Sequence, residues 1–299
     1  MTVTASSPPL CALHGLPGRP ASVSRPTFRG QQRRASSLRG SLCARALDTS
    51  VVPALLEQAS KSAPGLAAGA AANSTVFLLG APVLLAGLTP TGYAHAWVLG
   101  TTIYSAFGLS GYLLVCAYFV LGSAATKLKL KEKEAKGIAE KRSGRRGPGS
   151  VWGSGTAGVA CAVGSLLFPG SIAWQAGFVA SFCSKLCDTV SSEVGKGYGK
   201  KAFLVTNFKP VPPGTEGAVS VEGTAAGVAA AILVAGLGTL GGQVDAQGAL
   251  AVVAAALIAN YAESLLGATA QDSVAWLSND IVNVLQICLA AALALGFSR

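Results

Sequence analysis

Residues 185–224 bring together the side chains that phosphate and metal chemistry needs. The stretch reads KLCDTVSSEVGKGYGKKAFLVTNFKPVPPGTEGAVSVEGT, with Asp188, Glu193, Glu216 and Glu222 standing among lysines. A charge placed in hydrocarbon costs several kcal/mol by order of magnitude, so a lipid-solvated protein keeps few carboxylates near its apolar segments. An ordinary solvated loop between two spans would explain the lysines alone. We interpret the acids between apolar runs as part of a functional site.

Asp188 and Glu193 are the first two candidate catalytic residues and the candidate metal ligands. At about 100° per residue, Asp188 shares a helix face with Ser192 and lies roughly 140° from Glu193. One ion is therefore not easily chelated by both carboxylates unless the helix unwinds there. We expect separate roles: one carboxylate would hold Mg²⁺, and the other would act as a base or hold a second ion.

The segment VPPGTEG, residues 211–217, is a candidate phosphate-binding loop. Its prolines stiffen the chain, and its glycines let backbone amides approach an anion. It precedes an apolar run, so residues 215–220 could present the amides of a helix N-terminus to a phosphate, although most such loops are simple caps. No Walker A lysine pattern and no protein-kinase signature are present. The candidate phosphate contacts here are Lys209, Gly214, Thr215, Glu216, Gly217 and Ser220.

Glu263 is the third candidate catalytic acid, because an acid within YAESLLGA near the end of an apolar run is hard to explain by packing. Farther along, Asp272, Asn279, Asn283 and Gln286 fall within about 40° of one stripe if a single helix runs through them. Polar amides on an apolar helix usually hydrogen-bond between spans, which gives them a structural role. The supporting polar residues of the predicted site are Ser192, Gln271, Asn279 and Asn283.

The composition indicates a polytopic membrane protein. Hydrophobic residues make up 51% and charged residues 12% of the chain, and soluble domains carry roughly twice that charged fraction. The net charge of +10 arises from arginines that precede Asp48 and from nine Lys/Arg against three Glu in residues 127–146. No basic groove with interleaved aromatic residues is present, so we exclude a nucleic-acid partner. Neither a disulfide framework nor a metal site at Cys183 and Cys187 is expected.

Residues 1–46 have the composition of an organelle transit peptide. They contain Ser, Ala, Pro and seven Arg, and no acidic residue at all. Prolines and glycines within residues 17–26 argue against the long amphipathic helix of mitochondrial leaders. We therefore predict a plastid leader, followed by a membrane domain over residues 47–299.

The apolar runs predict an all-α, polytopic transmembrane helix bundle of about six or seven spans. The expected spans are residues 65–87, 97–122, 151–168, a fourth run ending near Cys187, 219–241, 248–269 and 281–297. Intervening hairpins then place the loops 123–150, 188–218 and 263–280 on one membrane face. The lysine and arginine excess of the first loop predicts that this face is the stroma. Arg145 and Arg146, which precede the third span, are further candidate phosphate contacts.

Four ordered motifs resemble those of an integral membrane family, domain-of-unknown-function family 92, also called the transmembrane protein 19 type. They are DTxxSExG at residues 188–195, VPPGTEG at 211–217, ESLLGATxQ at 263–271 and SNDIVN at 278–283. The Arg145-Arg146 pair is also similar, and the resemblance covers about residue 65 to the end. Two departures are visible: GPGSVWGSG after the arginines lacks the expected Gln and Asn, and Ala218 replaces a second glycine.

The resemblance, together with the leader, implies the phytyl-phosphate kinase activity of the plastid branch of that family, in tocopherol and phylloquinone synthesis. A nucleoside triphosphate would donate a phosphoryl group to phytyl monophosphate, with Mg²⁺ as the expected cofactor, in a plastid membrane that we expect to be the envelope. The implied partners are an isoprenoid phosphate lipid, a nucleotide and membrane lipid. The alternatives are an ion-coupled transporter using Glu263 and Asp188, a scaffold without chemistry, and a kinase for another isoprenoid alcohol or phosphate.

Overall fold

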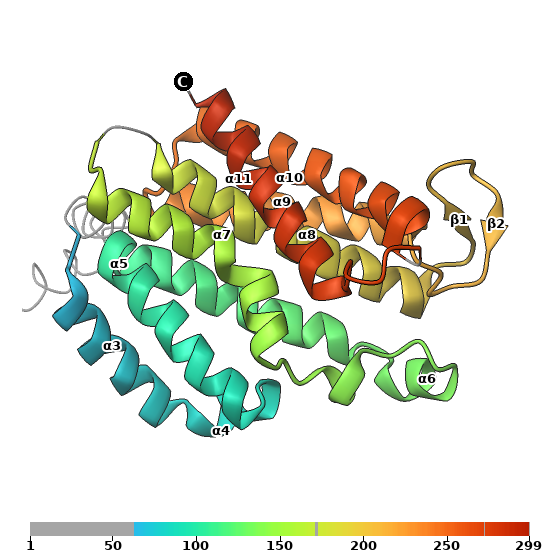
Figure 1. Cartoon of the computed structure of the whole chain (residues 1–299), viewed down its shortest axis with the longest axis horizontal. Coiled ribbons are helices and arrows are strands. Elements are labelled where there is room, and N and C mark those ends of the chain that lie inside the picture. Colours follow the sequence, from blue (N-terminus) through green and yellow to red (C-terminus); the bar gives the residue numbers. More distant parts are fainter. Residues whose placement is uncertain (1–62, 171–172, 272, 299) are drawn as a thin grey trace, which may run out of the picture. The chain divides into compact units, whose positions relative to one another are not determined.

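The computed structural model describes residues 63–170, 173–271 and 273–298, and these residues form a bundle of packed helices (Figure 1). The predicted transit peptide lies outside the described residues. The long helices after residue 147 are α7 (Pro148–Leu167), α8 (Trp174–Tyr198), α9 (Val221–Leu240), α10 (Ala246–Leu266) and α11 (Asn279–Phe297). A π-helical turn, η2 (Gly267–Gln271), extends α10.

The first predicted span is broken into two helices. α3 (Leu66–Leu79) and α4 (Ala81–Gly87) meet at Gly80 with a bend of 82°. Pro82 falls within the first two positions of α4, where its missing N–H group is not needed for a helical hydrogen bond. The chain therefore breaks at Gly80, two residues before Pro82, and the predicted first span consists of two helices.

The second predicted span, residues 97–122, is corrected by the structure. α5 (Pro90–Lys127) contains a non-helical residue, Gly108, with φ 64° and ψ −160°. A Cβ on Gly100 would lie 3.2 Å from the ring of Tyr112, although residues twelve apart in a straight helix are separated by about 18 Å. The two halves of α5 therefore form a helical hairpin that turns at Gly108 (Figure 1). Only glycine adopts this backbone conformation readily.

The hairpin brings the start of α5 next to its end. The Thr89 amide donates to the Arg146 carbonyl at 3.0 Å, and the Arg146 amide donates to the Gly87 carbonyl at 2.9 Å. The connection between α4 and α5 therefore lies beside the basic segment that follows α5. That segment, which we call the basic loop, covers residues 128–147 and contains α6 (Leu130–Ala135) and the 3-10 turn η1 (Lys141–Gly144).

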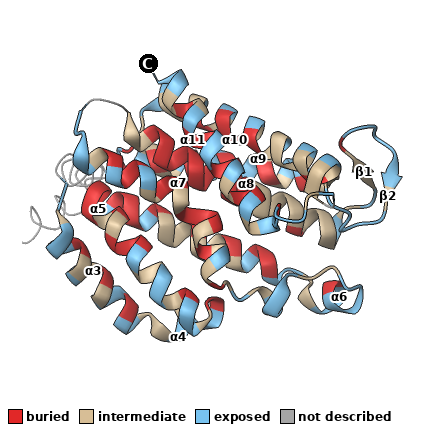
Figure 2. Ribbon diagram, viewed as in Figure 1, coloured by how far each residue is buried: buried red, intermediate tan, exposed pale blue. Residues whose placement is uncertain are grey.

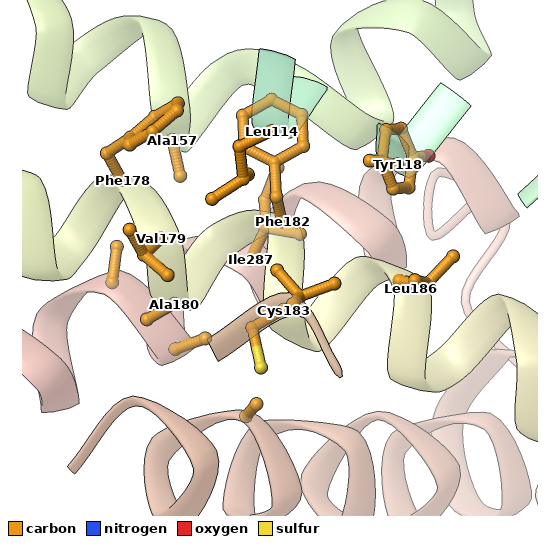
Figure 3. Close-up of a cluster of buried hydrophobic side chains, with 14 of the residues drawn as sticks. Leu114, Tyr118, Ala157, Phe178, Val179, Ala180, Phe182, Cys183, Leu186 and Ile287 are labelled. Atoms are coloured by element: carbon orange, nitrogen blue, oxygen red, sulfur yellow. The ribbon is translucent and has the colours of Figure 1, made fainter. Parts of the chain in front are cut away.

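α8 is the central helix, because it packs against α5, α7, α9, α10 and α11. Its residues from Ala176 to Cys187 are all buried (Figure 2). Phe178, Phe182 and Leu186 line up along it within the apolar cluster that α5, α7 and α11 complete (Figure 3). Neighbouring helices therefore shield α8 from lipid.

Within the described residues, five helices are long and apolar enough to cross a membrane: α5, α7, α9, α10 with η2, and α11. The bent pair of α3 and α4 makes a sixth if it counts as one span. These helices confirm the predicted all-α, polytopic architecture. α8, which corresponds to the predicted fourth span, is not among the five; it carries Lys185, Asp188 and Glu193 and relies on its neighbours for an apolar environment.

Close contact between α8 and α9 depends on small residues. A Cβ on Gly227 would come within 2.9 Å of the Cys187 carbonyl, and a Cβ on Gly223 would clash with the Ser191 carbonyl. Glycine at these two positions lets the helix backbones approach each other, as is common in membrane bundles.

The connection from α8 to α9 contains a small sheet that the sequence did not predict. Its strands are β1 (Ala202–Leu204), β2 (Pro210–Val211) and β3 (Ala218–Val219), antiparallel and in the order β2-β1-β3. α8 itself continues to Tyr198, so the first eleven residues of the predicted loop 188–218 are helical. Such short strands leave no clear period of alternation in the sequence.

Candidate functional site

The polar segments that follow α5, α8 and α10 meet at one end of the bundle. Gly217 has φ +72°, and a Cβ there would clash with Ala268 and with the Ser264 carbonyl at the end of α10. A Cβ on Gly214 would lie 2.7 Å from Ile138 in the basic loop. The VPPGTEG loop therefore lies between the basic loop and the ESLLGATAQ segment, in the arrangement that the predicted topology requires.

Lys185 is the centre of the polar cluster beside α8. Its Nζ donates to Asp188 Oδ2 at 2.5 Å and to Asn283 Oδ1 on α11 at 2.8 Å. The side chains of Lys185 and Asp188 are only 8% and 14% exposed. Lys185 also interacts electrostatically with Glu263 and Tyr118. One buried ammonium thus links residues from four helices.

The acids of this cluster come from three separate segments. Glu263 on α10 interacts electrostatically with Asp188, Lys185 and Glu216. Its Oε2 accepts a 3.4 Å hydrogen bond from the Ser264 hydroxyl. Three carboxylates and a single lysine leave a local excess of negative charge, which favours a cation. Asp188, Glu216 and Glu263 form what we call the acid cluster.

The donor set fits Mg²⁺ if substrate phosphates complete the coordination shell. Mg²⁺ prefers oxygen ligands and is usually held by one or two carboxylates together with phosphates and water. Among the described residues, no three His, Cys, Asp or Glu side chains lie close enough to hold a metal ion by themselves. Asp188 and Glu263, which interact electrostatically, are the carboxylates that would take part if the nucleotide and water supplied the remaining ligands.

Glu193 faces away from this cluster. Its Oε2 forms an ion pair with Lys133 of α6, and both side chains are only 1% exposed. Lys133 Nζ also donates to the Thr126 carbonyl at 2.9 Å, and Glu193 Oε1 is buried without a hydrogen-bond partner among the described residues. The separation of Asp188 and Glu193 expected from helix geometry is present, because the two carboxylates have different partners. The catalytic and metal-binding role of Glu193 stays a prediction.

Arg145 and Arg146 differ in their exposure and in their hydrogen-bond partners. Arg146 donates from Nη1 to the Tyr118 hydroxyl at 2.9 Å, and its guanidinium lies 5.0 Å from the centre of the Tyr118 ring. Arg145 is exposed, and it donates from Nη2 to the Leu88 carbonyl at 3.0 Å. Tyr118 thus connects Arg146 to Lys185. Both arginines lie at the same end of the bundle as the acid cluster.

The predicted phosphate loop is mostly exposed. Lys209, Thr215 and Glu216 are open to the surroundings, and the Thr215 hydroxyl donates to the Pro212 carbonyl at 2.8 Å. Ser220 is buried and caps α9, because its hydroxyl accepts from the Gly223 amide at 3.1 Å. The loop precedes a helix N-terminus as the sequence indicated, and its role as a phosphate contact stays a prediction.

The supporting polar residues lie on separate elements. No single helix runs through residues 273–286, because a non-helical stretch separates η2 from α11, so the condition for one polar stripe is not met; Asp272 lies outside the described residues. Gln286 is buried and donates to the Ser184 carbonyl at 3.3 Å. Asn279 is exposed, Gln271 lies in η2, and the Ser192 hydroxyl donates to the Thr189 carbonyl.

Sequence reasoning missed Lys185, Lys133 and Tyr118. Lys185 stands at the end of a wholly buried run, and a lysine in that position is costly unless it is paired. Lys133 is one of nine basic residues in residues 127–146, and no local signal separates it from its exposed neighbours.

A hollow lined by Gln175, Gln243 and Asp245 lies at the opposite end of the bundle, away from these residues.

Comparisons with known proteins agree on one family. The profile described as "Integral membrane protein DUF92" matches residues 73–291. "Protein VTE6, chloroplastic" of Arabidopsis thaliana is 45% identical over 276 residues, which cover 90% of this chain and 83% of that protein. An uncharacterized membrane protein of Synechocystis sp. is 51% identical over 228 residues, covering 75% of this chain and 88% of that protein. An uncharacterized membrane protein of Methanocaldococcus jannaschii is 29% identical over 195 residues, covering 65% and 79%. No solved structure gives a significant match.

Proposed function

Because the chain belongs to the DUF92 family of integral membrane proteins, we propose that it is a phytyl-phosphate kinase. It transfers a phosphoryl group from a nucleoside triphosphate to phytyl monophosphate, and the product is phytyl diphosphate for tocopherol and phylloquinone synthesis. The observation that carries the proposal is the acid cluster around Lys185 at the polar end of an apolar bundle, in a chain that is 45% identical to "Protein VTE6, chloroplastic".

The substrate's two parts match the two environments of the bundle. A phytyl chain is apolar and fits beside the lipid-facing surface of the helices, where large side chains such as Leu233, Leu250 and Ile258 are exposed. The phosphate is charged and fits the polar end, where Lys185, Arg145 and Arg146 lie. The substrate would therefore bind at the boundary between lipid and water, with its phosphate beside the acid cluster.

Phosphoryl transfer to a phosphate acceptor needs positioning and charge neutralisation more than it needs a base. The second pKa of a phosphate monoester is about 6, so the acceptor oxygen is already ionised at neutral pH. Asp188 and Glu263 would hold Mg²⁺, which neutralises nucleotide phosphates when it is bound. The VPPGTEG loop, with Lys209 nearby, would hold the donor phosphates. In this scheme neither carboxylate acts as a base.

Glu193 has a positioning role in this proposal. Its ion pair with Lys133 fixes α6 against α8, and the basic loop that contains α6 reaches Gly214 through Ile138. The pair thereby supports the loop that would bind nucleotide. This role differs from the catalytic one that the sequence predicted, and the two are separated by the variants described in the Discussion.

We propose a plastid membrane, the envelope, as the site of action. The family match begins at residue 73, downstream of the predicted transit peptide, and the relative from Arabidopsis thaliana is described as chloroplastic. The excess of positive charge in the basic loop supports a stromal position for the polar end. Labelling of single cysteines placed at Lys209, Glu132 and Ser273 in intact plastids should give one common sidedness, opposite to that of Gln247.

Purified protein in detergent tests the activity. It is given phytyl phosphate, Mg²⁺ and each nucleoside triphosphate in turn, and phytyl diphosphate is measured by mass spectrometry. We expect product with at least one nucleotide, loss of product on chelation of the metal, and none with Asp188→Ala. Product from free phytol or another isoprenoid phosphate, but not from phytyl phosphate, would assign the enzyme a different substrate. No product from any of these substrates would overturn the proposal.

A further inference from the structure

We propose that Lys185 binds a phosphate oxygen of the isoprenoid substrate, and that Asp188 and Asn283 hold its ammonium until the substrate arrives. The inference rests on the proposed function only in that a phosphorylated lipid is the ligand. It deepens the proposed function by assigning a direct phosphate contact to Lys185, which lies outside the four sequence motifs. Three properties of Lys185 support this role: its burial, its hydrogen-bond capacity and the charges around it.

The first premise is the position of Lys185. The residue lies on the central helix, directly after a run of buried residues, and it is followed by the fully buried Leu186. A lysine in such surroundings is costly unless its charge is compensated. Asp188 compensates that charge directly. Replacement of the pair by two apolar residues would solve the same packing problem without any charge, so packing alone gives no reason for an ion pair here.

The second premise is the capacity of the ammonium. A lysine ammonium has three N–H donors. Among the described residues, Lys185 donates two hydrogen bonds, to Asp188 and to Asn283. One donor thus remains for an incoming acceptor. Asp188 is the more exposed partner of the pair at 14%, so the open side of the cluster lies on the side of its carboxylate.

The third premise is the charge around the ammonium. Lys185 faces Asp188 on its own helix, Asn283 on α11, Glu263 on α10 and Tyr118 on α5. Tyr118 in turn accepts a hydrogen bond from Arg146. A substrate phosphate that accepts from the remaining donor would therefore share the positive charge of one ammonium with Asp188, and each would weaken the other's attraction to it. If Asp188 were to bind a divalent cation, more of the charge of Lys185 would be available to the phosphate. Cation binding and phosphate binding should then strengthen each other.

If Lys185 served only to neutralise Asp188, the variant Asp188→Asn would change phosphate binding differently. If Lys185 binds phosphate, Asp188→Asn removes its competitor and tightens phosphate binding in the absence of metal. If Lys185 only supports Asp188, the same change leaves phosphate binding unaltered or weakens it. The loss of any nearby negative charge also favours an anion, so a second variant must separate this general effect from the release of Lys185.

The experiment measures binding of phytyl phosphate to the full chain in detergent, with a chelator present and no nucleotide. We expect Asp188→Asn to tighten binding about tenfold and Lys185→Met to weaken it about tenfold. In the Lys185→Met background, Asp188→Asn should tighten binding by much less than tenfold, because the general effect of the lost negative charge remains but the release of Lys185 does not. Glu263→Gln, which removes a carboxylate that is not hydrogen-bonded to Lys185, should tighten binding less than Asp188→Asn.

Two outcomes would overturn the inference: no tightening in Asp188→Asn, or a double variant that retains the gain. The double variant removes both charges of the pair, so it tests the inference even if Lys185→Met alone does not fold. Thermal unfolding of each variant shows which ones are folded. If the unaltered chain makes phytyl diphosphate and the gain is not through Lys185, only the inference fails. If it makes no product and binds no isoprenoid phosphate, the proposed function fails with it.

Discussion

α8 takes part in two lysine–carboxylate pairs, which have the same chemistry but differ in their exposure and in their neighbours. Lys185 and Asp188 lie on the same helix, are 8% and 14% exposed, and share their neighbourhood with Asn283. Lys133 and Glu193 join a short helix of the basic loop to α8, and each is 1% exposed. The first pair is open on one side and surrounded by polar groups. The second is sealed.

This difference in exposure indicates whether a buried ion pair can take part in ligand binding. A sealed pair can hold two elements in register but cannot exchange partners with a ligand. An open pair with a spare donor and a nearby carboxylate can exchange partners with phosphate and cation. Both pairs consist of a lysine and a carboxylate, so residue type alone does not show which of them could bind a ligand. Accessibility and the identity of the neighbours are therefore the grounds on which we assign Lys185 and Asp188 to the proposed site, and Lys133 and Glu193 to its support.

Asp188→Asn should have the largest effect on the open pair. We expect kcat for phytyl diphosphate formation to fall about 10³-fold, because a charged group that positions the reacting phosphates is lost. The free energy of unfolding should fall by only about 1–2 kcal/mol, the cost of a lost buried hydrogen-bond partner, since Glu263 remains to offset the charge of Lys185. Product formation per folded protein and thermal unfolding in detergent measure the two effects. A variant that folds and turns over normally would remove Asp188 from the site.

Glu193→Gln should show the reverse pattern in the sealed pair. Loss of one partner leaves Lys133 buried without a counter-charge, which costs about 3–5 kcal/mol of stability. The folded fraction should keep kcat within a few fold of the unaltered chain and show a raised KM for nucleotide. These values come from thermal unfolding and from steady-state kinetics below the unfolding temperature. A stable variant without activity would instead support the catalytic role that the sequence predicted for Glu193.

A double substitution sharpens this contrast. Lys133→Met combined with Glu193→Leu removes both charges of the sealed pair, and it should return the free energy of unfolding to within about 1 kcal/mol of the unaltered chain. Activity should return with it. Lys185→Met combined with Asp188→Leu should restore stability in the same way but leave the enzyme inactive.

Gly217→Ala tests the surroundings of the open pair and should have an intermediate effect. Gly217 has φ +72° and packs on the Ser264 carbonyl and Ala268, so a methyl group adds backbone strain and pushes the VPPGTEG loop away from α10. We expect a cost of about 2 kcal/mol and a severalfold drop in kcat/KM for nucleotide. Gly236→Ala is the matched control, because a Cβ there meets nothing within 4 Å. Equal effects at both glycines would argue against the loop contact.

Glu132→Gln should have the smallest effect and sets the baseline for both buried pairs. Glu132 pairs with Lys129 at 3.4 Å, and the side chains are 59% and 34% exposed. Exposed pairs of this kind contribute roughly 0–1 kcal/mol. Thermal unfolding should shift by less than for any buried variant, and activity should be unchanged. A large loss here would indicate that the charge of the whole basic loop matters, and not the burial of Lys133.

Much of the architecture follows from the sequence. Long apolar runs predict the helices after residue 147, and hairpin parity places the VPPGTEG loop beside the end of α10, where Gly217 meets Ala268. The sequence did not predict the turn inside α5, because Gly108 lies in a long apolar run; the backbone angles of Gly108 and the approach of Tyr112 to Gly100 reveal it. Glycine inside a helical pattern is too common to mark a reversal by itself.

The site was predicted less completely than the fold. Asp188, Glu216 and Glu263 do interact, as shared placement at one end of the bundle suggested. The partners Lys185 and Lys133 escaped notice because a lysine near a predicted loop resembles a solvated one. Their burial depends on helices far away in the sequence: α11 supplies Asn283 to the first, and α8 supplies Glu193 to the second. No local pattern contains that information.

The central position of α8 bears on how the protein is made. A segment that carries Lys185, Asp188 and Glu193 partitions poorly into a bilayer when it stands alone, because each charge near the middle of a span opposes insertion. Its burial among α7, α9, α10 and α11 supplies the environment that lipid does not. We therefore expect α8 to enter the bilayer only after the helices that follow it in the chain have been synthesised. Insertion of α8 would then be coupled to that of α9, α10 and α11, and a chain truncated before α11 should fail to insert α8 stably.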